Sequence, residues 1–216
     1  GRWRAVLPQA IANRLATSAL DRIRIPTLRA TFENSDNKRL LKSFSHRLGL
    51  MHDHPVAQRI VTAWLSPGGM LVPAIGLDDC MARVLEHVSP VCPDLLLDQI
   101  EIEIRDRGFG GFEVRQNSRR TTILNMLVSL AYEPEAFDRC VNLLLLISGY
   151  EDTANNYDGV HDKIVQFFQP YLSGTHATME QRAAIVRTSL WSHDPNLRVL
   201  GFGMLSRTLG GPPWSG

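Results

Sequence analysis

Apolar side chains recur along this chain at helical spacing, in segments that begin at nearly regular intervals. The segments begin at Lys38, Leu77, Ser118, Tyr157 and Pro195, with intervals of 39, 41, 39 and 38 residues. Apolar residues three or four positions apart predict amphipathic helices, and no alternating β pattern of useful length occurs. A period of about 40 residues built from paired helices is typical of HEAT- and armadillo-like repeats. We therefore predict an all-α fold, a HEAT/armadillo-like α-solenoid of helical hairpins.

Prolines mark the second helix of three hairpins. Pro55, Pro93 and Pro134 stand where proline favours the first turn of a helix, and we expect Asp53 to cap the helix that follows it. The predicted hairpins span 38–65, 77–105, 118–150 and 157–191, and a last helix spans 195–209. Inside the first hairpin we expect the apolar residues of both helices to pack together: Phe44, Leu48 and Trp64. The last helix has no partner here and should leave Val199, Phe202 and Leu205 exposed.

Residues 1–37 form a separate N-terminal part in this prediction. Apolar residues four positions apart predict a helix from Pro8 to Ile25 with a single apolar face: Leu7, Ile11, Leu15, Ala19 and Ile23. Pro26 should stop that helix, and a short helix at 28–32 and a turn at 34–37 should follow. We expect residues 1–37 to pack on a solenoid of residues 38–209, with 210–216 as a tail. Because the chain starts with glycine rather than methionine, we expect an internal fragment of a larger protein.

Composition narrows the class of protein. Hydrophobic residues make up 44% and charged residues 21%, which is typical of a folded domain rather than a disordered chain. The longest apolar run, Val141–Ser148, is much shorter than the roughly 20 residues of a membrane span. Three scattered cysteines without a CxxC pair favour a reducing compartment, and we expect the cytoplasm.

Charge is unevenly distributed. Residues 1–50 contain ten lysines and arginines against three carboxylates, a net of +7, whereas the remainder has a net of −6. The candidate interface residues are Arg14, Arg22, Lys38, Arg39, Lys42 and Arg47, with a second cluster at Arg115, Arg119 and Arg120. We favour an intramolecular interface with an acidic neighbouring domain. The alternatives are that these basic residues form a solvated surface or that they bind the phosphates of a nucleic acid.

Possible nucleotide and metal sites lack essential parts. The stretch 108–111 is rich in glycine, but no strand precedes it and no Lys-Ser/Thr follows it, as a phosphate-binding loop requires. His46, His52 and His54 lie near Asp53 without a fourth ligand at a standard spacing, so we expect turn and capping roles. We predict no cofactor and no metal site.

Catalytic candidates are equally incomplete. Glu101 and Glu103 are two positions apart and should point to different sides of a helix, which favours a solvated face shared with Asp106. Ser45 and Ser173 have no histidine–aspartate arrangement that the sequence supports. We predict no catalytic residue.

Four stretches are more specific than helical periodicity requires. They are 7–16 (LPQAIANRLA), 40–49 (LLKSFSHRLG), 63–66 (AWLS) and 172–182 (LSGTHATMEQR). Together they resemble the helical region that follows the nucleotide-binding and winged-helix modules of large bacterial STAND-type P-loop ATPases. The resemblance covers nearly the whole chain, but its motifs are structural positions and not catalytic ones. ATPases of this family act as signal-responsive switches, and several of them act in anti-phage defence. The resemblance implies that the chain is part of such a switch and contacts an upstream nucleotide-binding module. The GxxxxGK[ST] motif that would bind phosphates is not in this sequence.

The residues and the resemblance together predict a non-enzymatic scaffold that couples a nucleotide switch to sensing or effector regions. The alternative is a HEAT-type module that binds nucleic acid through its basic N-terminal face. An enzyme on a helical scaffold is a third, less favoured hypothesis.

Overall fold

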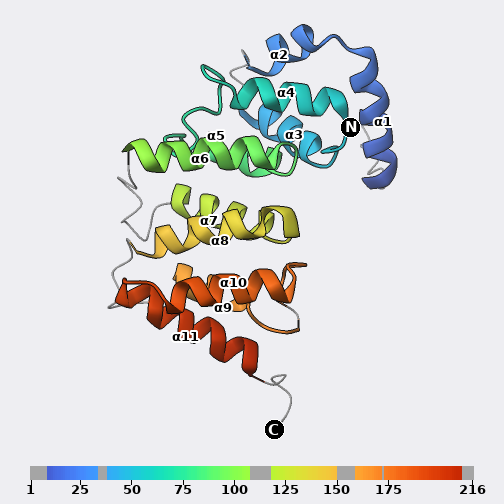
Figure 1. Cartoon of the computed structure of the whole chain (residues 1–216). Coiled ribbons are helices and arrows are strands. Elements are labelled where there is room, and N and C mark those ends of the chain that lie inside the picture. The colour runs from blue at the N-terminus through green and yellow to red at the C-terminus, as the bar shows by residue number, and fades with distance from the viewer. Residues whose placement is uncertain (1–8, 34–37, 108–117, 150–158, 172, 211–216) are drawn as a thin grey trace. The chain divides into compact units, whose positions relative to one another are not determined.

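The computed structural model describes residues 9–33, 38–107, 118–149, 159–171 and 173–210. These residues form eleven α-helices and no β-strand, so the predicted all-α class is confirmed (Figure 1). None of the described helices is both long enough and apolar enough to cross a bilayer. The chain divides into two compact units, residues 1–103 and 104–216.

The first unit contains the first six helices, although the last of them continues four residues into the second unit. They are α1 (Gln9–Arg22), α2 (Ile25–Glu33), α3 (Lys38–Gly49), α4 (Pro55–Leu65), α5 (Asp79–Val88) and α6 (Pro93–Arg107). The remaining helices belong to the second unit. They are α7 (Ser118–Leu130), α8 (Pro134–Ser148), α9 (Val160–Gln166), α10 (Met179–Leu190) and α11 (Pro195–Leu209).

Helices α3 and α5 pack on each other and run in the same direction. At their first turns, Lys38 Nζ lies 3.5 Å from Asp78 Oδ2, the residue that caps α5. At their last turns the backbones meet, because a Cβ on Gly49 would overlap the carbonyl oxygen of His87. Glycine at position 49 therefore allows the close approach of the two helix ends.

The core of the first unit is centred on α4. Trp64 is fully buried, as are Ile60 and Leu48. The ring of Phe44 meets Trp64 edge to face with centroids 6.2 Å apart and stacks on Phe32 at 3.9 Å. The expected burial of Trp64 and Leu48 and the contact of Trp64 with Phe44 are thus confirmed.

A carboxylate fixes the loop between α4 and α5. Glu103 on α6 is buried and accepts hydrogen bonds from the backbone N–H groups of Ala74 and Ile75, the latter at 2.8 Å. The predicted solvated face of Glu101, Glu103 and Asp106 is therefore wrong for Glu103. A buried carboxylate is tolerated there because two backbone donors satisfy it.

In the second unit α8 packs against both α7 and α9, and α11 packs against α9 and α10. The core contains Phe137 on α8 and the buried pair Phe167 and Phe168, whose ring centroids lie 6.0 and 6.3 Å from that of Phe137. The last helix, predicted to have no partner, therefore has two. Val199 and Phe202 on α11 are exposed as predicted, whereas Leu205 is half-buried.

Two predicted helices have different ends. The first ends at Arg22, and Pro26 lies in the first turn of α2 instead of stopping α1, because proline is well tolerated at the start of a helix. The helix predicted from Tyr157 to Leu172 is α9, which ends at Gln166, because Pro170 has no N–H to donate to the carbonyl of Gln166 and its ring would clash with that carbonyl in a continued helix. Tyr157 and Leu172 themselves, the turn at 34–37 and the glycine stretch at 108–111 lie outside the described residues.

Candidate interface

The predicted basic residues of the first unit occupy two helices. Arg14 and Arg22 are exposed on α1, and Lys38 and Arg39 are exposed in the first turn of α3. Lys42, one turn later in α3, is half-buried. Four of the predicted side chains therefore present their charge to solvent.

Arg47 has an internal role. It is half-buried at the end of α3, and its guanidinium donates a hydrogen bond to Oδ1 of Asn13 on α1. Part of the predicted basic set thus connects two helices within the unit.

The second predicted cluster is not a group of three surface charges. Arg120 on α7 is buried, with 6% of its surface exposed. Arg115 lies outside the described residues, and Arg119 is placed in α7 with no described side chain. The exposed part of the candidate interface consequently rests on the first unit.

Lys38 is the one exposed cation of the set with a carboxylate beside it among the described ion pairs. Asp78 accepts from the N–H of Met81 at 2.8 Å, and this bond lowers the pKa of Asp78 below its usual range; burial opposes the shift, and the charge of Lys38 adds to it. Because both groups of the pair are mostly exposed, it contributes little to stability.

The apolar face predicted for α1 does not pack against the rest of the unit. Ile11 is 49% exposed, Leu15 57% and Ile23, just after the helix, 42%, and Ala19 is also exposed. This face is therefore turned to solvent, and Leu7, the remaining residue of the predicted face, lies outside the described residues. Of the residues of α1 with described side chains, only Leu20 is buried.

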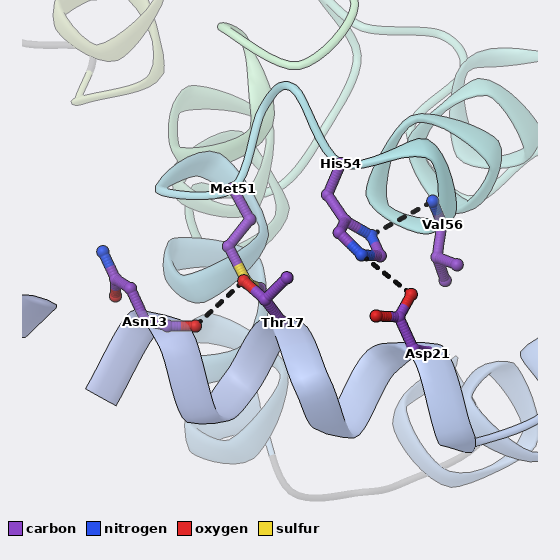
Figure 2. Close-up of polar contacts among 6 residues, drawn as sticks. All are labelled: Asn13, Thr17, Asp21, Met51, His54 and Val56. Atoms are coloured by element: carbon purple, nitrogen blue, oxygen red, sulfur yellow. Dashed lines mark hydrogen bonds and ion pairs between the residues drawn. The ribbon is translucent and has the colours of Figure 1, made fainter. Parts of the chain in front are cut away.

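A row of polar residues on the opposite side of α1 faces the unit instead. Figure 2 shows Thr17 and Asp21 turned toward Met51 and His54 in the segment between α3 and α4, and Asn13 one turn earlier accepts from Arg47 of α3. Thr17 Oγ1 lies 3.0 Å from the carbonyl oxygen of Asn13 and 3.4 Å from Sδ of Met51. Asp21 Oδ1 lies 3.1 Å from Nε2 of His54. We call Asn13, Thr17 and Asp21 the polar row.

His54 joins the polar row to the start of α4. Its Nδ1 accepts a hydrogen bond from the backbone N–H of Val56 at 3.2 Å, so Nε2 carries the hydrogen that is donated to Asp21 (Figure 2). The predicted cap, Asp53, is therefore wrong: the N-cap of α4 is His54. Asp53 is exposed and lies 3.4 Å from Nε2 of His52.

These histidines do not form a metal centre within the described residues. No group of three or more histidine, cysteine, aspartate and glutamate side chains there has a metal-binding arrangement. None of the three cysteines forms a disulfide bond, and Cys140 is buried.

Ser45 and His87 form a serine–histidine pair that the sequence did not indicate. Ser45 Oγ lies 3.0 Å from Nδ1 of His87, which belongs to the neighbouring helix. Ser45 is fully buried and donates to the carbonyl oxygen of Lys42 at 2.9 Å, so the pair joins α3 to α5 and presents no accessible nucleophile. Pairing of residues 42 positions apart is a consequence of helix packing, and no local pattern indicates it.

The stretch 173–182 is held by Arg182, which is buried on α10. Its guanidinium donates to Ser173 Oγ at 2.8 Å, to the carbonyl oxygen of Gln169 at 3.0 Å and, more weakly, to that of Thr175 at 3.4 Å. Burial lowers the pKa of Arg182. Ser173 is thus a hydrogen-bond acceptor in a structural turn.

The same stretch attaches the start of α10 to the turn between α7 and α8. Thr175 Oγ1 donates to the carbonyl oxygen of Ala131 at 2.6 Å. Thr178 and Gln181 form a capping box, and Gln181 Nε2 also donates to the carbonyl oxygen of Pro134 at 2.8 Å. These residues, part of the resemblance noted in the sequence, therefore serve the fold.

Comparison with protein-family models, with curated proteins and with solved structures gives no match. The functional hypothesis therefore depends on the surfaces of the chain itself.

Proposed function

We propose that this chain is a helical scaffold, part of a STAND-like ATPase, that couples a nucleotide switch to sensing or effector regions. Its basic surface, defined as the exposed Arg14, Arg22 and Arg39, binds an acidic neighbouring protein domain. The observation that carries the proposal is that these three arginines are exposed on one unit with no carboxylate beside them among the described ion pairs. A protein partner with carboxylates at the interface would compensate their charge.

The solenoid belongs to the same proposal. Helices α3, α5, α7 and α9 begin at Lys38, Asp79, Ser118 and Val160, about 40 residues apart, as in HEAT- and armadillo-like repeats. A scaffold of stacked hairpins buries its core between neighbours and leaves long surfaces for partners.

The proposal is tested in the polypeptide that carries this chain beside its neighbouring domains. Replacing Arg14, Arg22 and Arg39 by glutamate should accelerate limited proteolysis at the junction, because like charges would then oppose the interface. The isolated chain should keep its Tm within a few degrees, since exposed charges contribute little to stability.

A matched control separates an interface from a general effect of net charge. Arg105, Arg187 and Arg207 are exposed arginines that belong to the second unit, and their replacement by glutamate changes net charge equally. This variant should leave proteolysis unchanged. If the basic-surface variant is also as resistant as the wild type, the arginines form a solvated surface and the proposal fails.

The second candidate function is nucleic-acid binding through the same arginines. It is favoured by the concentration of positive charge in residues 1–50. Affinity for duplex DNA that falls steeply with salt and is lost on reversing Arg14, Arg22 and Arg39 would support it, because phosphate contacts release counterions.

A further inference from the structure

The two sides of α1 differ in chemistry: one carries polar residues that contact the unit, and the other carries exposed apolar residues. Ile11 and Asn13 are two residues apart, which places them about 200° apart around the helix axis. The same offset separates Leu15 from Thr17. The apolar row of Ile11, Leu15 and Ala19 therefore lies opposite the polar row, and it is the polar row that contacts the unit (Figure 2).

Positive charge borders the apolar row. Arg14 and Arg22, both exposed, lie three positions after Ile11 and Ala19, so they occupy the adjacent ridge of the helix with Ser18 between them. No described ion pair neutralises either arginine. The outward face of α1 is thus an apolar row beside a cationic row.

This arrangement leaves apolar surface in water while hydrogen-bonding groups contact the unit. Single exposed leucines are ordinary on protein surfaces, but an apolar row along one helix is typical of a contact site. Turning the row inward would bury it only by removing the polar row from Arg47, Met51 and His54. The fold therefore holds α1 by the polar row together with the buried Leu20, and it leaves Ile11, Leu15 and Ala19 exposed.

We infer that the outward face of α1 binds an amphipathic helix of a partner protein, whose apolar row packs on Ile11, Leu15 and Ala19 and whose glutamates or aspartates pair with Arg14 and Arg22. This inference rests on the proposed function and specifies the chemistry of the partner. Because the apolar row follows the i, i+4 ridge of α1, a partner helix that also packs with its i, i+4 ridge would cross α1 at about −50°.

Other partners fit the face less well. Nucleic acid would use the arginines but gains nothing from Ile11 and Leu15, and α1 has no aromatic side chain on which a base could stack. A membrane surface favours a wide apolar face with tryptophan or phenylalanine, which this narrow row lacks. An acidic amphipathic helix uses both rows.

The test uses two designed helical peptides of about 18 residues, each with leucines at i, i+4 spacing, one flanked by glutamates and the other by lysines. Fluorescence anisotropy with the full chain should show binding of the glutamate-flanked peptide and weaker binding of the lysine-flanked one. Leu15→Ser should weaken binding about tenfold or more, because it removes apolar contact area. The double variant Arg14→Glu, Arg22→Glu should reverse the preference between the two peptides.

Phe202→Ser is the matched control, because Phe202 is a similarly exposed apolar residue on α11. It should leave peptide binding unchanged, and circular dichroism should show that every variant remains helical. Absence of binding to the glutamate-flanked peptide would overturn the inference. So would binding to duplex DNA or to vesicles of anionic phospholipid that is stronger than peptide binding and lost in the same variants.

One outcome separates this inference from the proposed function. If reversing Arg14 and Arg22 abolishes binding but Leu15→Ser has no effect, the partner is recognised by charge alone. The helix-docking inference then fails while the charged interface stands. If the proteolysis experiment also shows no effect of reversing the arginines, the proposed function fails as well.

Discussion

At the scale of single residues, Trp64 illustrates how one side chain connects several elements. It is fully buried on α4, meets Phe44 of α3 edge to face, and donates from Nε1 to Glu33 Oε1 at 2.6 Å. Glu33 also accepts from Nε of Arg29 at 2.6 Å. Loss of the indole would therefore remove core volume and one partner of a carboxylate.

We expect Trp64→Ala to lower the free energy of unfolding by about 3–5 kcal/mol, as large-to-small core changes do. Trp191→Ala is the matched control, since Trp191 is 83% exposed, and it should have almost no effect. Urea unfolding followed by circular dichroism measures both. A loss below about 1 kcal/mol for Trp64→Ala would contradict the burial of this residue.

His87 gives the first unit a dependence on pH. Burial and then the nearby His46, whose ring centroid is 5.1 Å away, lower the pKa of His87 from its ordinary value of 6.5. At a pH between the lowered pKa of folded His87 and 6.5, the unfolded chain binds more protons at this residue than the folded chain does. Neutral His87 therefore contributes fully to the stability of the fold above pH 6.5, and this contribution is lost as the pH falls through that range.

His87→Gln should therefore flatten the fall in Tm on going from about pH 8 to pH 5, relative to the wild type. His46→Gln should flatten it partly, because it removes the neighbouring charge. His193→Gln, at an exposed histidine, should keep the wild-type dependence. Scanning calorimetry across the pH range provides the measurement, and identical slopes for His87→Gln and wild type would contradict this assignment.

The structural roles of single residues were harder to predict from the sequence than the helices were. The order His-Asp-His before Pro55 offers three possible caps, and the choice of His54 depends on Asp21, which is distant in sequence. The helical pattern indicates that Glu103 is a surface residue, yet Glu103 is buried against a loop that is distant in sequence, whose backbone N–H groups donate to it. Both depend on tertiary contacts that local patterns do not contain.

At the scale of helices, the sequence predicted where a helix begins better than which side of it contacts the rest of the unit. Proline in the first turn located α4, α8 and α11, because its fixed φ suits that position and its missing N–H costs nothing there. The periodicity of α1 correctly indicated two unlike faces but not which face contacts the unit. That choice depends on whether partners such as Met51 and His54 are available to polar side chains. The interface character of the exposed arginines stays a prediction.

The contacts of α1 predict that it opens independently of the core. α1 buries Leu20 alone among its described side chains, whereas α4 buries Ile60, Val61 and Trp64 completely. Hydrogen bonds at the polar row can be replaced by water at small net cost. We expect amide hydrogens of α1 to exchange about 100-fold faster than those of α4, relative to intrinsic rates.

Hydrogen exchange followed by mass spectrometry tests this expectation. Asp21→Ala, which removes the contact with His54, should accelerate exchange in α1 further and leave α4 unchanged. Equal protection of the two helices would show that α1 is part of the cooperative core.

At the scale of the whole molecule, the sequence contains no loop of the GxxxxGK[ST] type that could bind nucleotide phosphates. We therefore expect no binding of Mg-ATP by this chain alone, even if it belongs to an ATPase. Isothermal calorimetry is the direct measurement, and micromolar affinity would contradict the expectation.

Helices α3 and α5 point in the same direction, so their peptide dipoles add instead of cancelling. Two partial positive charges meet at the starts of the helices, where the carboxylate of Asp78 caps α5, and two partial negative charges meet at the ends, where His46 and His87 lie. Antiparallel neighbours would place opposite poles together and need no such side chains. The direction of one helix pair thus concentrates dipole charge at its two ends. Lys38 and Arg39 add further positive charge beside the helix starts, and Asp78 offsets it, so replacing Asp78 by a cation would remove the carboxylate that opposes both dipoles there.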